Sequence, residues 1–161
     1  MGADLDRDAD LGHVLIGLRR AELRDVQSIR GIDAKAYPRR WSEKMTIEQT
    51  TGNGRIHFVA EQDHRVIAHG GIAVLADVAH VTTIAVAPMH QRRGIATVLM
   101  RRLFEAAKAN GCEEITLEVR AGNEGAIALY ERLGFESAGV RPGYYGDNGE
   151  DALILWRSLD A

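Results

Sequence analysis

The sequence contains a single cysteine, Cys112, among its 161 residues, and this scarcity excludes two classes of protein. One thiol can form no disulfide within the chain, and it cannot supply the thiolates of a structural zinc site. The chain therefore suits a reducing compartment, and we expect a cytoplasmic protein. No apolar run approaches the roughly 20 residues that a membrane-spanning helix needs, so no membrane partner is expected.

Runs of basic residues are also missing. The chain has 20 Lys and Arg against 23 Asp and Glu, which gives a net charge of −3 with His neutral. Nucleic-acid-binding proteins usually present a basic face, so we expect no direct nucleic-acid binding and rather a cationic partner. The histidines lack the H-x-E and H-E-x-x-H spacings of metal enzymes, so no metal is expected. They are His13, His57, His64, His69, His80 and His90.

The length predicts one domain with one hydrophobic core, because neither a repeat nor a Pro/Ser-rich linker divides the chain. Residues 1–12 carry Asp4, Asp6, Asp8 and Asp10. They lack the basic-then-apolar order of a signal peptide, so we expect a disordered lead-in there. Residues 13–161 then form the domain.

Hydrophobic periodicity and turn residues predict alternating strands and helices. Antiparallel hairpins at both ends and β-α-β crossovers in the middle indicate an α+β fold, with a mixed sheet of about six to seven strands flanked by about four helices. Strands are expected over residues 14–19, 56–61, 66–75, 81–86, 115–119, 135–140 and 152–159. Helices are expected over residues 22–36, 42–49, 94–109 and 126–133.

The segment Gln91-Arg92-Arg93-Gly94-Ile95-Ala96 lies between an expected strand and the long helix. Backbone N–H groups at a helix N-terminus are unpaired and attract anions such as pyrophosphate. Gly94 and Ala96 leave room for an anion, and Arg92 and Arg93 add positive charge. The dinucleotide-binding and P-loop glycine patterns are absent. An ordinary helix start with basic surface residues is the alternative.

A second block, Leu117-Glu118-Val119-Arg120 followed by Asn123, Leu129-Tyr130 and Gly134-Phe135, is more specific. With Ile84-Ala85-Val86-Ala87-Pro88 and the turn at 91–96, and with Tyr144-Tyr145 and Glu150-Asp151-Ala152, it resembles the RimI-type ribosomal-protein-alanine N-acetyltransferases. These enzymes are a branch of the GNAT superfamily. The resemblance covers residues 14–159 and is dense from Ile84 onward.

The resemblance implies the GNAT fold, in which the strand ending at Val86 splays from the strand ending at Val119. It also implies an enzyme that transfers acetyl from acetyl-CoA to a protein N-terminus, here the alanine terminus of a small-subunit ribosomal protein. By similarity, Glu118 is the general base and Tyr130 the general acid, and Trp41, Tyr144 and Tyr145 bind the acceptor. The residues expected to bind acetyl-CoA are Ile84, Ala85, Val86, Gln91, Arg92, Arg93, Gly94, Ile95, Ala96, Thr97, Asn123 and Tyr130.

These roles suit the chemistry. A protonated amine cannot attack a thioester, so a carboxylate is useful to remove the proton, and a Tyr hydroxyl can protonate the departing thiolate. An α-amine has a pKa of about 7.7–8.0, so a modest base suffices. Cys112 has no obvious activating partner, which favours direct transfer over a covalent enzyme intermediate.

Each candidate residue also has a structural interpretation. Glu118 could point to solvent by strand alternation, and Tyr130 could be a core residue. Asn123 could serve only as an N-cap, and the Tyr144-Tyr145 pair could only pack the loop. For His69 and His80, near strands that could border the cleft, ordinary strand or surface roles are favoured.

The chain departs from the family pattern in two places. Arg39 and Arg40 separate Pro38 from Trp41, where relatives commonly have proline directly before tryptophan, and Gly122 stands where Ser is common. Because the first change falls in a loop of the acceptor side, the acceptor could instead be a polyamine, an aminoglycoside or a lysine side chain. A CoA-sensing module without catalysis is a third hypothesis, which the retention of both candidate catalytic residues opposes.

Overall fold

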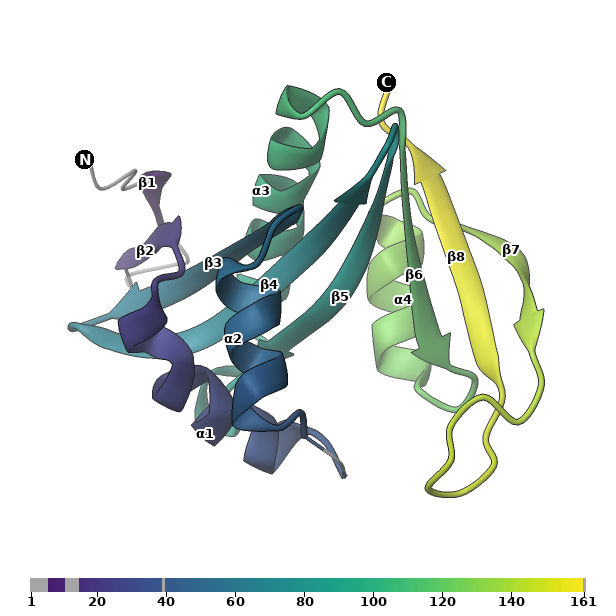
Figure 1. Cartoon of the computed structure of the whole chain (residues 1–161), viewed down its shortest axis with the longest axis horizontal. Coiled ribbons are helices and arrows are strands. Elements are labelled where there is room, and N and C mark those ends of the chain that lie inside the picture. The colour runs from purple at the N-terminus through teal and green to yellow at the C-terminus, as the bar shows by residue number, and fades with distance from the viewer. Residues whose placement is uncertain (1–5, 11–14, 39, 161) are drawn as a thin grey trace.

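The computed structural model describes residues 6–10, 15–38 and 40–160, which form one eight-stranded sheet covered by helices (Figure 1). The spatial order of the strands is β1-β2-β3-β4-β5-β6-β8-β7. The strands are β1 (Asp6–Asp10), β2 (Leu15–Arg20), β3 (Arg55–Gln62), β4 (Arg65–Leu75), β5 (Val78–Val86), β6 (Glu114–Arg120), β7 (Glu136–Arg141) and β8 (Ala152–Ser158). The helices are α1 (Val26–Ala36), α2 (Glu43–Thr51), α3 (Ile95–Ala109) and α4 (Glu124–Arg132), with 3₁₀ turns η1 (Leu23–Asp25) and η2 (Pro88–His90).

The expected mixed sheet and its four helices are confirmed. Every neighbouring pair of strands is antiparallel except β5 and β6, which are parallel. Helices α1 and α2 lie on one face of the sheet, and α3 and α4 lie on the other (Figure 1). None of the helices in the described part of the chain is long and apolar enough to cross a membrane.

Residues 6–10, within the expected lead-in, form strand β1. Its backbone pairs with β2, with Asp6 opposite Leu18 and Ala9 opposite Ile16. Backbone N–H and C=O groups make this pairing, so it does not depend on the apolar alternation from which strands are recognised in a sequence. The rest of the lead-in, residues 1–5 and 11–12, lies outside the described residues, as do residues 13–14, Arg39 and Ala161.

The core between α3 and the sheet fixes the end of β5 relative to the start of α3. Apolar residues recur along α3 at helical spacing and are fully buried, at 0–1 % exposure; they are Ile95, Leu99, Met100 and Leu103. Each such side chain contributes about 1.5–3 kcal/mol when removed from water. This packing holds the N-terminus of α3 beside the strand that precedes it.

The sheet divides between its two parallel strands. β5 and β6 pair only where Val78, Ala79 and His80 face residues 114–116. Farther along, β5 stays paired with β4 as far as Val86, and β6 stays paired with β8 as far as Arg120. The two strands therefore separate toward their carboxyl ends, as Figure 1 shows. The expected splay is confirmed.

Candidate active site

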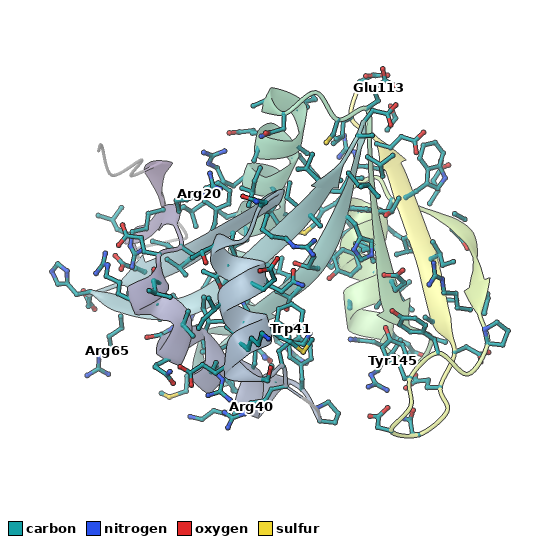
Figure 2. All side chains as sticks on the ribbon, in the orientation of Figure 1. Arg20, Arg40, Trp41, Arg65, Glu113 and Tyr145 are labelled. Atoms are coloured by element: carbon teal, nitrogen blue, oxygen red, sulfur yellow. The ribbon has the colours of Figure 1, made fainter. Side chains whose placement is uncertain are left out.

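The opening between β5 and β6 continues into a cleft of about 930 Å³. Its walls come from the end of α1 and the loop after it, from β5, β6 and α4, and from the β7–β8 loop (residues 142–151). The predicted site residues that line it are Trp41, Ile84, Glu118, Asn123, Tyr130, Tyr144 and Tyr145. Figure 2 shows Trp41 and Tyr145 on opposite sides of the opening. None of the predicted site residues lines a second cavity, of about 770 Å³, between α1 and the β3–β4 turn.

Glu118 lies on β6 with its carboxylate held inside the cleft. Its Oε2 is 2.6 Å from Nε2 of His80 on β5, and its Oε1 is 3.9 Å from the guanidinium of Arg141. The Glu118 side chain is only 15 % exposed, so it does not point into open solvent as strand alternation allowed. An ionised Glu118 accepts the Nε2–H of His80, which leaves Nδ1 of a neutral His80 without a proton.

An ordinary strand or surface role was expected for His80, so its contact with Glu118 was not predicted from the sequence. His80 is the last β5 residue paired with β6, opposite Thr116, two residues before Glu118. Residues two apart on a strand share a face, which lets the imidazole reach the carboxylate. The signal in the sequence was a histidine directly before residues 81–86, the strand that was expected to splay from the strand of the candidate base.

Tyr130 is buried in the core and also lines the cleft. Its ring lies in the core, 7 % exposed and 5.7 Å from the ring of Phe135 in an edge contact, while the residue also lines the cleft. Burial raises the pKa of Tyr130 well above its usual value, and the nearby Tyr37 and Tyr145 add to the shift. The hydroxyl therefore stays protonated and is available as a donor.

The free edge of β5 presents backbone groups to the opening. The N–H of Ala87 donates to Ile67 on β4 at 2.8 Å, so the alternate residues Ile84 and Val86 direct their backbone groups the other way. The Ile84 carbonyl accepts the Tyr37 hydroxyl at 2.7 Å, and the Val86 carbonyl accepts the side-chain amide of Gln91 at 3.1 Å. Side chains thus already satisfy the two carbonyls, and the N–H groups of the same residues face the opening.

The turn from β5 into α3 has the form of an anion site. Arg92 and Gly94 both adopt left-handed backbone, with φ of 64° and 80°. Gly94 is the N-cap of α3 and provides no capping side chain, so the first N–H groups of the helix are left for an external acceptor. The side chains of Ala85 and Ile95 are buried in the core, so these two predicted contacts could bind a ligand only through their backbone.

Asn123 is the expected N-cap of α4, since its Oδ1 accepts the N–H of Ala126 at 3.2 Å, and it also lines the cleft. Cys112 is buried, and burial raises the pKa of its thiol, which makes it a poor nucleophile. In the described ranges, no three His, Cys, Asp or Glu side chains are grouped so that they could hold a metal ion.

The sequence and the fold are similar to those of known acetyltransferases. The sequence model of the acetyltransferase (GNAT) family matches residues 26–135. A ribosomal protein bS18-alanine N-acetyltransferase of Escherichia coli is 37 % identical over 136 residues, covering 83 % of this chain and 91 % of that protein. An N-alpha-acetyltransferase of Saccharolobus solfataricus is 35 % identical over 155 residues, covering 88 % and 92 %.

The solved structures agree with the sequence relatives. The crystal structure of the ribosomal-protein-S18-alanine N-acetyltransferase from Escherichia coli superimposes with a TM-score of 0.84 at 33 % identity, covering 91 % of this chain and 95 % of that one. The resemblance found in the sequence is confirmed, and the chain belongs to the GNAT acetyltransferase family.

Proposed function

We propose that this protein transfers the acetyl group of acetyl-CoA to the α-amine of a protein N-terminus, the N-terminal alanine of a small-subunit ribosomal protein. The observation that carries the proposal is the Glu118–His80 pair, which lies with Tyr130 in one cleft bordered by Trp41 and Tyr145. The relatives named for the alanine of ribosomal protein bS18 support this choice of acceptor. Such an acceptor places the reaction in the cytoplasm.

The residues present fit acetyl-CoA as the donor. In the described chain the Thr82 hydroxyl oxygen is buried without a hydrogen-bond partner and its residue lines the cleft, so a polar ligand group would satisfy it. The N–H groups of Ile84 and Val86 suit the amide carbonyls of the pantetheine arm, and the turn at Arg92–Gly94 suits the pyrophosphate. The donor supplies the acetyl group as an activated thioester.

Glu118 and His80 together can accept the proton of the incoming amine. The imidazole Nδ1 of a neutral His80 is a base, and the charge of Glu118 at 2.6 Å stabilises the imidazolium that results. The neutral amine nitrogen then forms its bond to the acetyl carbon while the carbon–sulfur bond breaks, and the second proton of the nitrogen passes to the departing thiolate, which leaves as the CoA thiol. An N-terminal α-amine, with a pKa of about 7.7–8.0, gives up this proton far more readily than a lysine at about 10.4.

Tyr130 serves the leaving group. Its raised pKa makes full proton transfer to a thiolate unfavourable, because a thiol with a pKa of about 8.5 is the stronger acid. The protonated hydroxyl therefore stabilises the departing thiolate by donating a hydrogen bond. Direct transfer also accords with the position of Cys112, whose neighbour Glu113 lies at the end of the molecule away from Tyr145 (Figure 2).

The test is release of CoA thiol from acetyl-CoA with two peptides, one with a free N-terminal alanine and one with that amine blocked. We expect turnover with the free terminus alone, and a loss of about 100-fold in kcat for Glu118→Gln. Glu131→Gln, an exposed position on α4, is the matched control and should keep full activity. Turnover of lysine peptides, polyamines or aminoglycosides with none of the free terminus would overturn the acceptor. Acetyl-CoA binding without turnover of any amine would indicate a sensing module.

A further inference from the structure

We propose that Arg120 is a positioning residue that holds the β7–β8 loop in place, so that Tyr145 forms the acceptor wall of the cleft. This inference takes only the identity of the acceptor from the proposed function. Arg120 ends β6 and lies two residues after Glu118, so both side chains leave the same face of the strand. One strand therefore carries the candidate base and the group that anchors the loop across from it.

Arg120 binds the far side of the loop through its guanidinium. Its two terminal nitrogens donate to the two carboxylate oxygens of Asp147 at 3.1 and 3.0 Å, and one of them also lies 3.3 Å from Asn148 Oδ1 and 3.4 Å from Glu150 Oε1. The side chains of Arg120, Asp147 and Glu150 are 22–27 % exposed, so water reaches them only in part. The hydrogen bond from Arg120 lowers the pKa of Asp147, so this carboxylate stays ionised at lower pH than an ordinary aspartate.

The same guanidinium stacks on Tyr145. Its central carbon lies 4.0 Å from the centre of the Tyr145 ring, and the Tyr144 ring meets that ring edge-on at 5.1 Å. The loop closes around this point, since the N–H of Tyr145 donates to the carbonyl of Glu150 and the N–H of Gly149 donates to the carbonyl of Tyr145. Most of the loop is otherwise exposed, and such segments open easily without an anchor.

Glu150 extends the anchor to the donor side of the cleft. Its Oε2 accepts the N–H of Gly122 at 2.7 Å, directly before Asn123, the N-cap of α4. A Cβ at Gly122 would lie 2.7 Å from that same oxygen, so a glycine permits the close approach. Arg120, Asp147 and Glu150 therefore link the β7–β8 loop to the turn before α4, the helix that carries Tyr130.

Lysine cannot reproduce these contacts. A guanidinium is planar, binds a carboxylate with two parallel hydrogen bonds and stacks on an aromatic ring, whereas an ammonium group is a point charge. We therefore expect Arg120→Lys to recover part of the function that Arg120→Gln loses. If Arg120 contributed only to overall folding, we would not expect Arg120→Lys to recover function that Arg120→Gln loses.

The kinetic test compares Arg120→Gln and Arg120→Lys with Arg101→Gln, a control at an exposed position of α3. For Arg120→Gln we expect the KM of the peptide to rise about tenfold, while kcat and the KM of acetyl-CoA change less than about threefold. Arg120→Lys should fall between, and Arg101→Gln should match the wild type. An unchanged peptide KM, or equal changes in the KM of both substrates, would overturn the positioning role.

A double variant tests whether Arg120 acts through Tyr145. If it does, Arg120→Gln combined with Tyr145→Ala has the same peptide KM as Tyr145→Ala alone, because the contact has already been lost. If the two effects multiply in full, Arg120 acts on the acceptor by another route, and the inference is wrong.

Hydrogen exchange of the loop tests the anchor without any acceptor. In Arg120→Gln the backbone amides of residues 143–150 should exchange at least about tenfold faster than in the wild type, with no change in Arg101→Gln. Faster exchange in a protein that acetylates no peptide terminus would refute the proposed acceptor while supporting the anchor. Unchanged exchange in a protein that acetylates peptides would refute the anchor and leave the proposed function standing.

Discussion

Acid should destabilise this protein through one buried histidine, His57. It is fully buried, with its Nε2 2.9 Å from Nδ1 of His69, whose Nε2 lies 2.7 Å from Oδ1 of the buried Asp33. Burial first, and the neighbouring His69 second, lower the pKa of His57 from 6.5 to about 3. The folded protein therefore keeps His57 neutral at pH values where an unfolded chain would protonate it.

The sign and the size of the pH effect on stability follow from the lowered pKa of His57. Between about pH 6.5 and pH 3 the unfolded state binds one more proton at this site, so the free energy of unfolding rises with pH by about 1.4 kcal/mol per unit. The contribution is fully present above pH 6.5 and is lost as the pH falls below it. Integrated from pH 8 to pH 5, the expected loss is about 2 kcal/mol.

The assay is urea unfolding of the wild type and His57→Gln at pH 8, 7, 6 and 5. Glutamine can still hydrogen-bond to His69 but does not titrate, so the wild type should lose about 2 kcal/mol more than the variant over this range. Because the two proteins are compared by how their free energy of unfolding changes with pH, any pH-independent loss of stability caused by the substitution cancels. His64→Asn, at an exposed turn residue with φ of 64°, should keep the wild-type dependence. Equal pH dependence in the wild type and His57→Gln would refute the reasoning.

Three further substitutions test the packing and the site. In Gly71→Ala the new Cβ would lie 2.3 Å from Nδ1 of the fully buried His57, so we expect a loss of about 1–3 kcal/mol in urea unfolding, and unchanged stability would show that the ring can move. Tyr130→Phe should lower kcat, and the rate of the wild type should not decline up to about pH 9.5, because the raised pKa keeps the hydroxyl protonated. Arg92→Gly should raise the melting temperature through a gain of about 1 kcal/mol, since a left-handed φ of 64° is strained for arginine, while raising the KM of acetyl-CoA. A KM that stays the same would remove Arg92 from the anion site.

The fold was largely predictable because its elements follow from local patterns. The α3 helix, for example, repeats apolar residues at helical spacing and stops at Asn110 and Gly111, and the structure places it at Ile95–Ala109. The gap between β5 and β6 was expected from the family resemblance alone. It depends on how far two strands from distant parts of the chain stay paired, and no local pattern reports that.

The parts of the site that the sequence did not predict are contacts between residues far apart in the chain. His80 and Glu118 are 38 residues apart, and Asp33 and His69 are 36 apart. Each histidine alone fits an ordinary strand position. The carboxylate that it contacts can be identified only once the strand register and the position of α1 on the sheet are known. Arg120 was noticed as part of a motif, but its contacts with the β7–β8 loop depend on the fold of that loop.

The two halves of the divided sheet each carry one wall of the acceptor side. On the β5 half, α1 is held by the Asp33–His69 contact and, one turn later, by the Tyr37 hydroxyl on the Ile84 carbonyl. On the β6 half, Arg120 holds the opposite loop.

The His80–Glu118 contact crosses from one half to the other at the end of the short β5–β6 ladder, from its last paired β5 residue to a β6 residue just past it. Because β5 and β6 share so short a ladder, this contact helps set the distance between the walls in addition to the proton transfer proposed for it. Removing His80 should therefore weaken acceptor binding together with turnover. Removing Tyr130, which belongs to the β6 half alone, should lower turnover and leave the peptide KM near its wild-type value.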